Sequence, residues 1–207
     1  MTAARLVVWR HGRTEWNATG RFQGQSDVGL DDVGRRQAAA AARELARLGI
    51  DQIVSSDLVR ARDTAEALAT VTGLPVTTDP RLREIHVGTW AGLTSHEVAD
   101  VDPEYADAYA RGEDYRRSAT GETTTEVAHR ASTALTEIVR AAADDTTVVA
   151  AMHGLAGRVG VCAFLDLPYE TWHSFAGLHN CAWVILRRAR NLRWRLDGYN
   201  LTAPRPD

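Results

Sequence analysis

Histidines and arginines of this sequence stand where short apolar runs end. The first run, residues 6–9 (Leu-Val-Val-Trp), leads directly into Arg10, His11 and Gly12. An apolar, β-branched run without alternation is typical of a buried parallel strand, and open α/β sheets bind their ligands at the carboxyl ends of such strands. Arginine offers phosphate a planar fork of donors, and histidine is a nucleophile that titrates near neutral pH. The stretch therefore indicates phosphoryl chemistry.

Two later runs bring further candidates to the same place. The second run, residues 50–55, is followed by a helix start whose first turn contains Arg60. A third run, residues 146–152, ends at His153 and Gly154. Because the carboxyl ends of parallel strands meet at one edge of a sheet, we expect these groups to lie beside Arg10 and His11.

Taken in order, these motifs resemble those of the histidine phosphatase superfamily, which contains the cofactor-dependent phosphoglycerate mutases and many small phosphomonoesterases. The resemblance spans nearly the whole chain, and the C-terminal residues 194–200 resemble glucosyl-3-phosphoglycerate phosphatases of actinobacteria. The matching segments are Arg10-His11-Gly12 with Thr14 and Asn17, residues 55–65 with Arg60, residues 82–92 with Glu84, and His153-Gly154.

The resemblance implies a catalytic role for five residues. His11 is the nucleophile that becomes phosphorylated, and Glu84 is the general acid and base. Arg10, Arg60 and His153 hold the phosphate oxygens. His11 must be neutral to attack, and we expect the neighbouring cations to lower its pKa below about 6.5.

Substrate contacts are less defined at this level. Asn17 and the Gly154 amide are expected to complete the phosphate cradle. Gln23, in the polar loop 20–34, either contacts the substrate or is a solvated loop amide. Arg116 and Arg117 either act like the paired arginines with which phosphoglycerate mutases hold a carboxylate, or are solvated loop charges.

Two departures from the family pattern surround the second histidine. Relatives carry Ser-His-Gly-Gly, whereas this chain has Met152 before His153 and Leu155 after Gly154. The first change removes a hydroxyl and the second removes a glycine. The surroundings of the phosphate can therefore differ from those in the family.

We expect no metal and no other cofactor. His86 lies two residues after Glu84, so a set that also included His11 or His153 could suggest a metal site. The arginines expected beside such a site would repel a cation.

Composition limits the function further. The chain is 44% hydrophobic and 25% charged, and no apolar run approaches the roughly 20 residues that span a membrane. Residues 1–5 leave no room for the apolar part of a signal peptide, so we expect a cytoplasmic protein. The net charge of -3 argues against a nucleic-acid binder.

Arginine without lysine, with abundant alanine, is typical of a high-GC bacterial source. A homodimer through the apolar C-terminal strands is compatible with the sequence.

The elements that must position these residues form an α/β fold. We expect a phosphoglycerate mutase-like, three-layer α/β/α sandwich with a mainly parallel central sheet and an antiparallel edge strand, built as a single domain over residues 1–207. A small cap-like region around residues 94–125 is expected to set substrate choice. Apolar periodicity predicts strands at 6–9, 50–55, 75–78, 146–152, 182–187 and 193–199, and helices at 35–48, 95–111 with a break at Pro103, 126–143, 157–165 and from 168 to 172.

Three functions follow from these observations. The first is a metal-independent phosphomonoester hydrolase that works through a phosphohistidine on a small phosphorylated metabolite, such as a phosphoglycerate or sugar phosphate derivative. The second is a cofactor-dependent phosphoglycerate mutase-type phosphotransferase, although the longer cap insertion of those mutases is missing. The third is a non-catalytic module that binds a phosphorylated ligand. The presence of all five core residues argues against the third.

Overall fold

A six-stranded sheet forms the centre of the computed structural model, which describes residues 2–191 and 193–204. The strand order is β3-β2-β4-β1-β5-β6. Strands β3, β2, β4 and β1 are parallel to one another, whereas β5 runs antiparallel to β1 and β6 antiparallel to β5. The predicted, mainly parallel sheet with an antiparallel edge is confirmed. The strands are β1 (Arg5–Arg10), β2 (Gln52–Ser55), β3 (Val76–Thr78), β4 (Thr147–Met152), β5 (Trp183–Arg188) and β6 (Trp194–Leu201).

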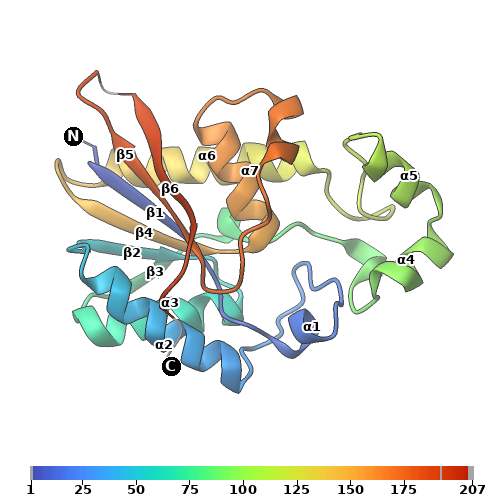
Figure 1. Cartoon of the computed structure of the whole chain (residues 1–207), viewed down its shortest axis with the longest axis horizontal. Helices are drawn as coiled ribbons and strands as arrows, with labels where there is room; N and C mark the ends of the chain where they lie inside the picture. The colour runs from blue at the N-terminus through green and yellow to red at the C-terminus, as the bar shows by residue number, and fades with distance from the viewer. Residues whose placement is uncertain (1, 192, 205–207) are drawn as a thin grey trace.

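Helices cover both faces of the sheet (Figure 1). Helices α2 (Asp32–Ala46) and α3 (Val59–Thr72) pack on one face, and α6 (Thr124–Ala141) and α7 (Gly154–Phe164) pack on the other. The strands between them are apolar throughout because both of their faces are buried, as in β4, where all six residues are buried. The three-layer arrangement is thus confirmed.

Capping residues explain why several helices start earlier than their apolar periodicity predicts. The Asp31 side chain accepts a hydrogen bond from Gly34 N, so α2 begins at residue 32. Thr123 and Glu126 form a capping box, so α6 begins at residue 124. Helix α7 begins at Gly154, directly after His153 and three residues before its predicted start.

The remaining elements are short and lie beside the carboxyl ends of the parallel strands (Figure 1). The predicted helix over 95–111 is split at Pro103, as expected. The predicted helix at 168–172 is instead a 3₁₀ turn. These elements are α1 (Glu15–Ala18), α4 (Ser95–Val101), α5 (Glu104–Ala110) and the 3₁₀ turns η1 (Pro80–Leu82), η2 (Gly88–Trp90) and η3 (Tyr169–Ser174).

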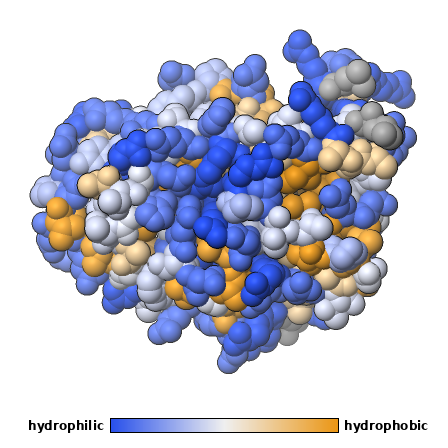
Figure 2. Space-filling model, turned by 180° about the vertical axis from the view of Figure 1, so that it is seen from behind, coloured by the Kyte–Doolittle hydropathy of each residue, from blue (hydrophilic) through white to orange (hydrophobic). Residues whose placement is uncertain are grey.

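The surface is mainly hydrophilic on the side shown in Figure 2, with hydrophobic residues in small separate patches. No helix within the described ranges combines the length and apolarity needed to cross a bilayer.

Candidate active site

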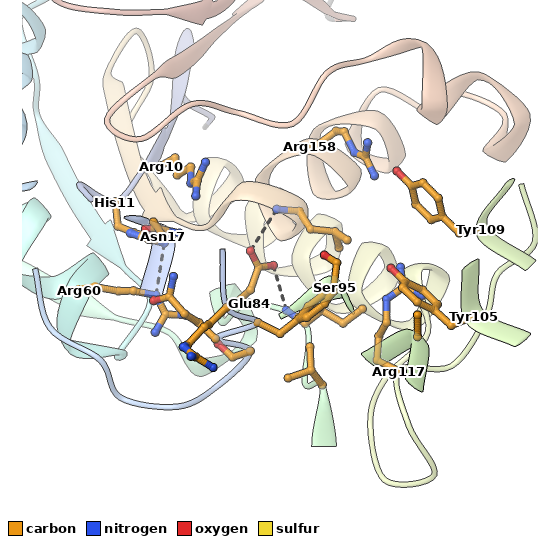
Figure 3. A pocket seen from close by; sticks show the side chains of 18 of the residues that line it. Arg10, His11, Asn17, Arg60, Glu84, Ser95, Tyr105, Tyr109, Arg117 and Arg158 are labelled. Carbon is orange, nitrogen blue, oxygen red and sulfur yellow. Dashed lines mark hydrogen bonds between the residues drawn. The ribbon is translucent and has the colours of Figure 1, made fainter. Parts of the chain in front are cut away.

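A pocket of about 590 Å³ opens where β1 and its parallel neighbours end (Figure 3). It is bounded by the end of β1, the loop 21–24, the start of α3, the loop around residue 84, helix α7 and the region 95–117. The strand ends converge as the sequence predicts. Seven of the ten predicted site residues line the pocket: Arg10, His11, Asn17, Gln23, Arg60, Glu84 and Arg117.

His11 lies at the base of the pocket with a defined tautomer. Its Nδ1 is 2.7 Å from the carbonyl oxygen of Gly12, and because a carbonyl only accepts, Nδ1 carries the hydrogen. Nε2 therefore keeps its lone pair, which accepts a hydrogen bond from Arg60 Nε at 3.3 Å. Burial, followed by the charges of Arg60 and Arg10, lowers the pKa of His11 well below 6.5. The ring is thus neutral at pH 7 and its Nε2 is a nucleophile.

Arg60 has two functions in this geometry. Its side chain is fully buried in the first turn of α3, and burial lowers its pKa to about 10, so it remains charged at neutral pH. Its Nη1 and Nη2 donate to the carbonyl oxygens of Ser26 and Gly24, at 2.8 and 2.7 Å. Arg60 therefore faces His11 with one edge and orders the loop over the pocket with the other.

Arg10 approaches the start of α7 closely. Its Nη1 donates to the carbonyl oxygen of Leu178, while its buried Nε has no protein partner. A Cβ on Gly154 would lie only 3.2 Å from Arg10 Nε, so the absence of a side chain at this position makes room for the guanidinium group. Gly154 is also the first residue of α7, and its N–H has no acceptor within the helix.

His153 is fully buried behind His11. Their ring centres are 5.2 Å apart, and His153 Nε2 is 2.9 Å from Ser56 Oγ. Its Nδ1 is buried without a partner, and burial together with the charge of Arg60 lowers its pKa well below 6.5. His153 is therefore a neutral hydrogen-bonding group. Ser56 follows the last residue of β2 and is a site residue that the sequence motifs do not single out, although two hydroxyls, Ser55 and Ser56, end the second apolar run.

Glu84 rests on the N-terminus of α7. Its Oε1 accepts from the backbone N–H groups of Ile85 and Ala156, both at 2.9 Å, and its Oε2 accepts from Leu155 N at 3.1 Å. The first N–H groups of a helix and its dipole stabilise an anion at this point. The carboxylate is thus held at the pocket wall by backbone groups (Figure 3).

An ion pair behind the pocket supports Glu84. Arg130 on α6 is 2.7 Å from Glu122, and Glu122 in turn accepts from His86 N at 2.8 Å. Arg130 also donates to carbonyl oxygens of the loop that carries Glu84, including that of Glu84 itself at 2.9 Å. The sequence motifs do not identify this pair. The one signal for it is Glu122, in the segment that corresponds to Gly-Gly-Glu-Ser of the family.

The amides Asn17 and Gln23 both present groups to the pocket. Asn17 Oδ1 accepts from Thr14 N and Asn180 Nδ2, at 3.2 and 3.1 Å, so its amide nitrogen is left for a ligand. Gln23 is only 8% exposed and its Oε1 has no protein partner. It is therefore not the solvated loop amide that the sequence left open.

The two adjacent arginines separate. Arg117 is 5% exposed, lines the pocket, and stacks over Tyr105 with its guanidinium carbon 4.9 Å from the ring centre. Arg116 instead forms a half-exposed ion pair with Glu126 at 2.6 Å and does not line the pocket. Of the two alternatives that the sequence leaves open for Arg116, this position favours the surface charge, because its guanidinium binds Glu126 and the carbonyl oxygen of Gly121.

The departures beside His153 occupy different surroundings. Met152 is fully buried in the core between the sheet and α7. Leu155 forms part of the pocket wall, and its N–H donates a hydrogen bond to Glu84.

His86, the other residue that could suggest a metal site, has its Nδ1 3.0 Å from the carbonyl oxygen of Thr120. Over residues 2–191 and 193–204, no group of three or more His, Cys, Asp or Glu side chains is placed to hold a metal ion.

Comparisons with known proteins agree with this geometry. A family model for the histidine phosphatase superfamily (branch 1) matches residues 6–202. A glucosyl-3-phosphoglycerate phosphatase of Mycolicibacterium vanbaalenii is 42% identical over 98% of this chain and 97% of its own length. A probable phosphoglycerate mutase of Yersinia pestis is 34% identical over 86% of this chain and 81% of its own. The solved structure of a mycobacterial glucosyl-3-phosphoglycerate phosphatase with VO3 has a TM-score of 0.89 and 39% identity, covering 96% of this chain and 100% of that one. The chain belongs to the histidine phosphatase superfamily.

Proposed function

We propose that the protein is a phosphatase that hydrolyses the phosphomonoester of a small metabolite through a phosphohistidine on His11. One observation carries this proposal: a neutral His11 that lines the pocket beside the buried Arg60 and the half-buried Arg10, with its Nε2 meeting Arg60. A phosphoryl-transfer transition state needs mainly positioning and positive charge. Arg10 and Arg60 supply that charge, so the proposed reaction uses no metal ion.

In the first step, His11 Nε2 attacks phosphorus and the bond to the ester oxygen breaks. The donor that Nε2 meets in the free protein, Arg60 Nε–H, binds a phosphate oxygen instead. Arg10, Asn17 and the Gly154 N–H hold the remaining oxygens. Glu84, protonated at this stage, gives its proton to the leaving alkoxide.

In the second step, water attacks the phosphohistidine. Glu84, now a carboxylate, takes a proton from that water, and the bond between phosphorus and His11 Nε2 breaks to release phosphate. Three backbone N–H groups hold the Glu84 carboxylate in position at the pocket wall for this task. Because the carboxylate regains its proton from water, the cycle closes.

Phosphate release measured with a chelator present throughout tests the reaction. We expect the wild-type protein to release phosphate and His11→Ala to release none while keeping the wild-type melting temperature. Rapid alkaline quenching should trap a phosphohistidine only in the wild type. Wild-type turnover by a folded His11→Ala protein would exclude the mechanism.

The named relatives reduce the number of candidate substrates to assay. Glucosyl-3-phosphoglycerate is the first compound to assay, because the names of the 42% identical relative and of the solved structure give it as their substrate. A phosphoglycerate mutase is the second candidate, supported by the named relative from Yersinia pestis and by Arg117 in the pocket. Activity that depends on a bisphosphorylated primer would favour the mutase. The cytoplasmic location and the homodimer stay predictions.

A further inference from the structure

The hydroxyl of Ser56 and the ring of His153 share a hydrogen bond, and the surroundings of the hydroxyl decide which of them donates. Both side chains are fully buried, and Ser56 Oγ is 2.9 Å from His153 Nε2. Ser56 Oγ accepts from Leu58 N at 3.3 Å. Among the described residues, His153 Nε2 is the one atom that can accept the hydroxyl hydrogen. Ser56 is therefore the donor and His153 Nε2 the acceptor.

The tautomer of His153 follows from this direction. Burial, followed by the charge of Arg60, lowers the pKa of His153 well below 6.5, so the ring is neutral and carries one hydrogen. Since Nε2 accepts, that hydrogen is on Nδ1. The place of His153 directly before α7 agrees with this. A lone pair on Nδ1 could accept from the first N–H groups of the helix, and the side chain forms no such bond.

The Nδ1–H of His153 is a donor without an acceptor. It is buried and has no partner among the described residues, an arrangement that costs free energy until an acceptor arrives. The ring lies beside the proposed phosphate position. Its centre is 5.2 Å from that of His11, the next residue is Gly154, and the charges of Arg60 and Arg10 act on it. A phosphate oxygen is an acceptor of the required kind.

The backbone of Ser56 is fixed by the sheet. Its N–H donates to the carbonyl oxygen of Ala151 at 2.8 Å, and its own carbonyl oxygen accepts from Ser55 Oγ at 2.8 Å. Ala151 belongs to β4 and lies two residues before His153, and β2 and β4 are neighbouring parallel strands. The pairing of these two strands therefore sets the distance between the hydroxyl and the ring.

We propose that Ser56 is a positioning residue, whose hydroxyl holds His153 in the tautomer with the hydrogen on Nδ1 so that the ring donates to a phosphate oxygen. This inference rests on the proposed function, because it places the phosphate between Arg10 and Arg60. In the other tautomer Nδ1 has a lone pair, which repels a phosphate oxygen. Ser56 thus acts on the phosphate only through His153.

NMR spectroscopy of isotope-labelled protein tests the tautomer directly. Once the ring of His153 is assigned through the backbone, correlations between its nitrogens and its carbon-bound hydrogens show which nitrogen carries the hydrogen. We expect Nδ1–H in the wild type and a mixture of tautomers in Ser56→Ala. Ser55→Ala is the matched control, because it removes a buried hydroxyl that binds the Ser56 carbonyl and not the ring. Hydrogen on Nε2 in the wild type would overturn the proposal, whether or not the variants fold.

Inorganic phosphate and turnover measure the consequence of the tautomer. Added phosphate should shift the Nδ1–H resonance of His153 in the wild type. We expect Ser56→Ala to weaken phosphate binding and to lower kcat for a phosphomonoester, each by about tenfold, the range for one hydrogen bond. Ser55→Ala should change both by less than about twofold. An unshifted resonance at saturating phosphate, or equal losses in the two serine variants, would contradict the role of Ser56.

The same measurements separate this proposal from the proposed function. If the wild type releases no phosphate from any ester, the phosphatase proposal fails, yet the spectra and the binding of inorganic phosphate still test Ser56. If turnover occurs while His153 carries its hydrogen on Nε2, the phosphatase proposal stands and the role of Ser56 is refuted.

Discussion

The two ends of the pocket are built differently. At the strand end, His11, Arg60 and His153 are at most 2% exposed, and backbone carbonyls or a buried hydroxyl hold them. At the far end, Tyr109 is 52% exposed and Arg117 is held by one carbonyl and an aromatic ring. We propose from this comparison that the sheet fixes the reacting groups, whereas the segment between β3 and α6, which carries Tyr109 and Arg117, contributes to the choice of substrate. Substitutions at the strand end should therefore lower kcat/KM for all phosphate esters. Substitutions at the far end should lower it for only some of them.

After His11→Ala, the largest expected effect comes from Glu84→Gln, and its size should depend on the leaving group. An alkyl phosphate needs a proton on its leaving oxygen, so we expect kcat to fall about 10³-fold. Nitrophenyl phosphate leaves as a stable anion, so its phosphohistidine-forming step should fall about tenfold or less. Single-turnover kinetics with both esters measures the difference. Glu66→Gln, an exposed change on α3, is the control. Equal losses for both esters would contradict the role of Glu84 as an acid.

Arg60→Gln should affect all phosphate esters alike. Removing one donor to the transition-state charge is expected to lower kcat/KM by about 10²- to 10³-fold, whether or not the ester carries a carboxylate. Arg117→Gln should instead lower kcat/KM about tenfold for carboxylate-bearing esters alone. Steady-state kinetics on 3-phosphoglycerate and glycerol 3-phosphate compares the two. If Arg117→Gln acts on both esters equally, the two ends of the pocket are not separable.

The buried histidines predict a pH dependence of stability. His11 and His153 have lowered pKa values in the folded protein, so below about pH 6.5 the unfolded chain binds more protons than the folded one. Stability is therefore present above that pH and is lost as pH falls. Each such group contributes at most about 1.4 kcal/mol per pH unit, a limit approached only well below pH 6.5. Urea unfolding at pH 6.5 and 5.5 measures the loss.

His11→Ala is the control for the pH prediction. It removes one of the two titrating groups, so its loss of unfolding free energy over the same interval should be about half that of the wild type. An unchanged loss would show that His11 titrates normally in the folded state.

An effect smaller than that of Glu84→Gln is expected from the ion pair behind Glu84. Arg130→Met removes the donors that hold the loop carrying Glu84. We expect kcat for an alkyl phosphate to fall about tenfold, while nitrophenyl phosphate changes by less than about twofold. Glu137→Gln, on the same helix as Arg130, breaks an exposed ion pair with Arg81 of η1 and is the control. Equal losses for both esters would mean that Arg130 supports the fold but does not position Glu84.

The strand end of the pocket could be predicted almost completely from the sequence. Apolar runs identify β1, β2 and β4, and the chain places its charged residues directly after them. The order of these motifs then brings Arg10, His11, Arg60 and His153 together. Such strands can be predicted from local sequence because a parallel strand that is buried on both faces is a continuous apolar run.

The far end could not be predicted because it depends on tertiary partners. Arg116 and Arg117 are adjacent and chemically identical, and only the positions of Glu126 and Tyr105 decide which of them enters the pocket. Arg158 and Arg130 both fall in helical sequence where arginines are commonly exposed. Only the structure shows that Arg158 Nε is buried without a partner and that Arg130 is shared between Glu122 and the carbonyl oxygens of the loop that carries Glu84.

The bonds between His86 and Glu122 have a consequence for how the protein can be altered. Glu122 N donates to His86 O at 2.8 Å, and His86 N donates to the Glu122 carboxylate at 2.8 Å. The two residues that flank the segment 87–121 are thus adjacent in space, and the segment carries Tyr105, Tyr109 and Arg117. We therefore expect that this segment can be exchanged between relatives with the junctions at His86 and Glu122, provided that its core residues Trp90 and Val98 are kept. Chimeras made in this way should inherit their substrate preference from the donor and their reaction from the host.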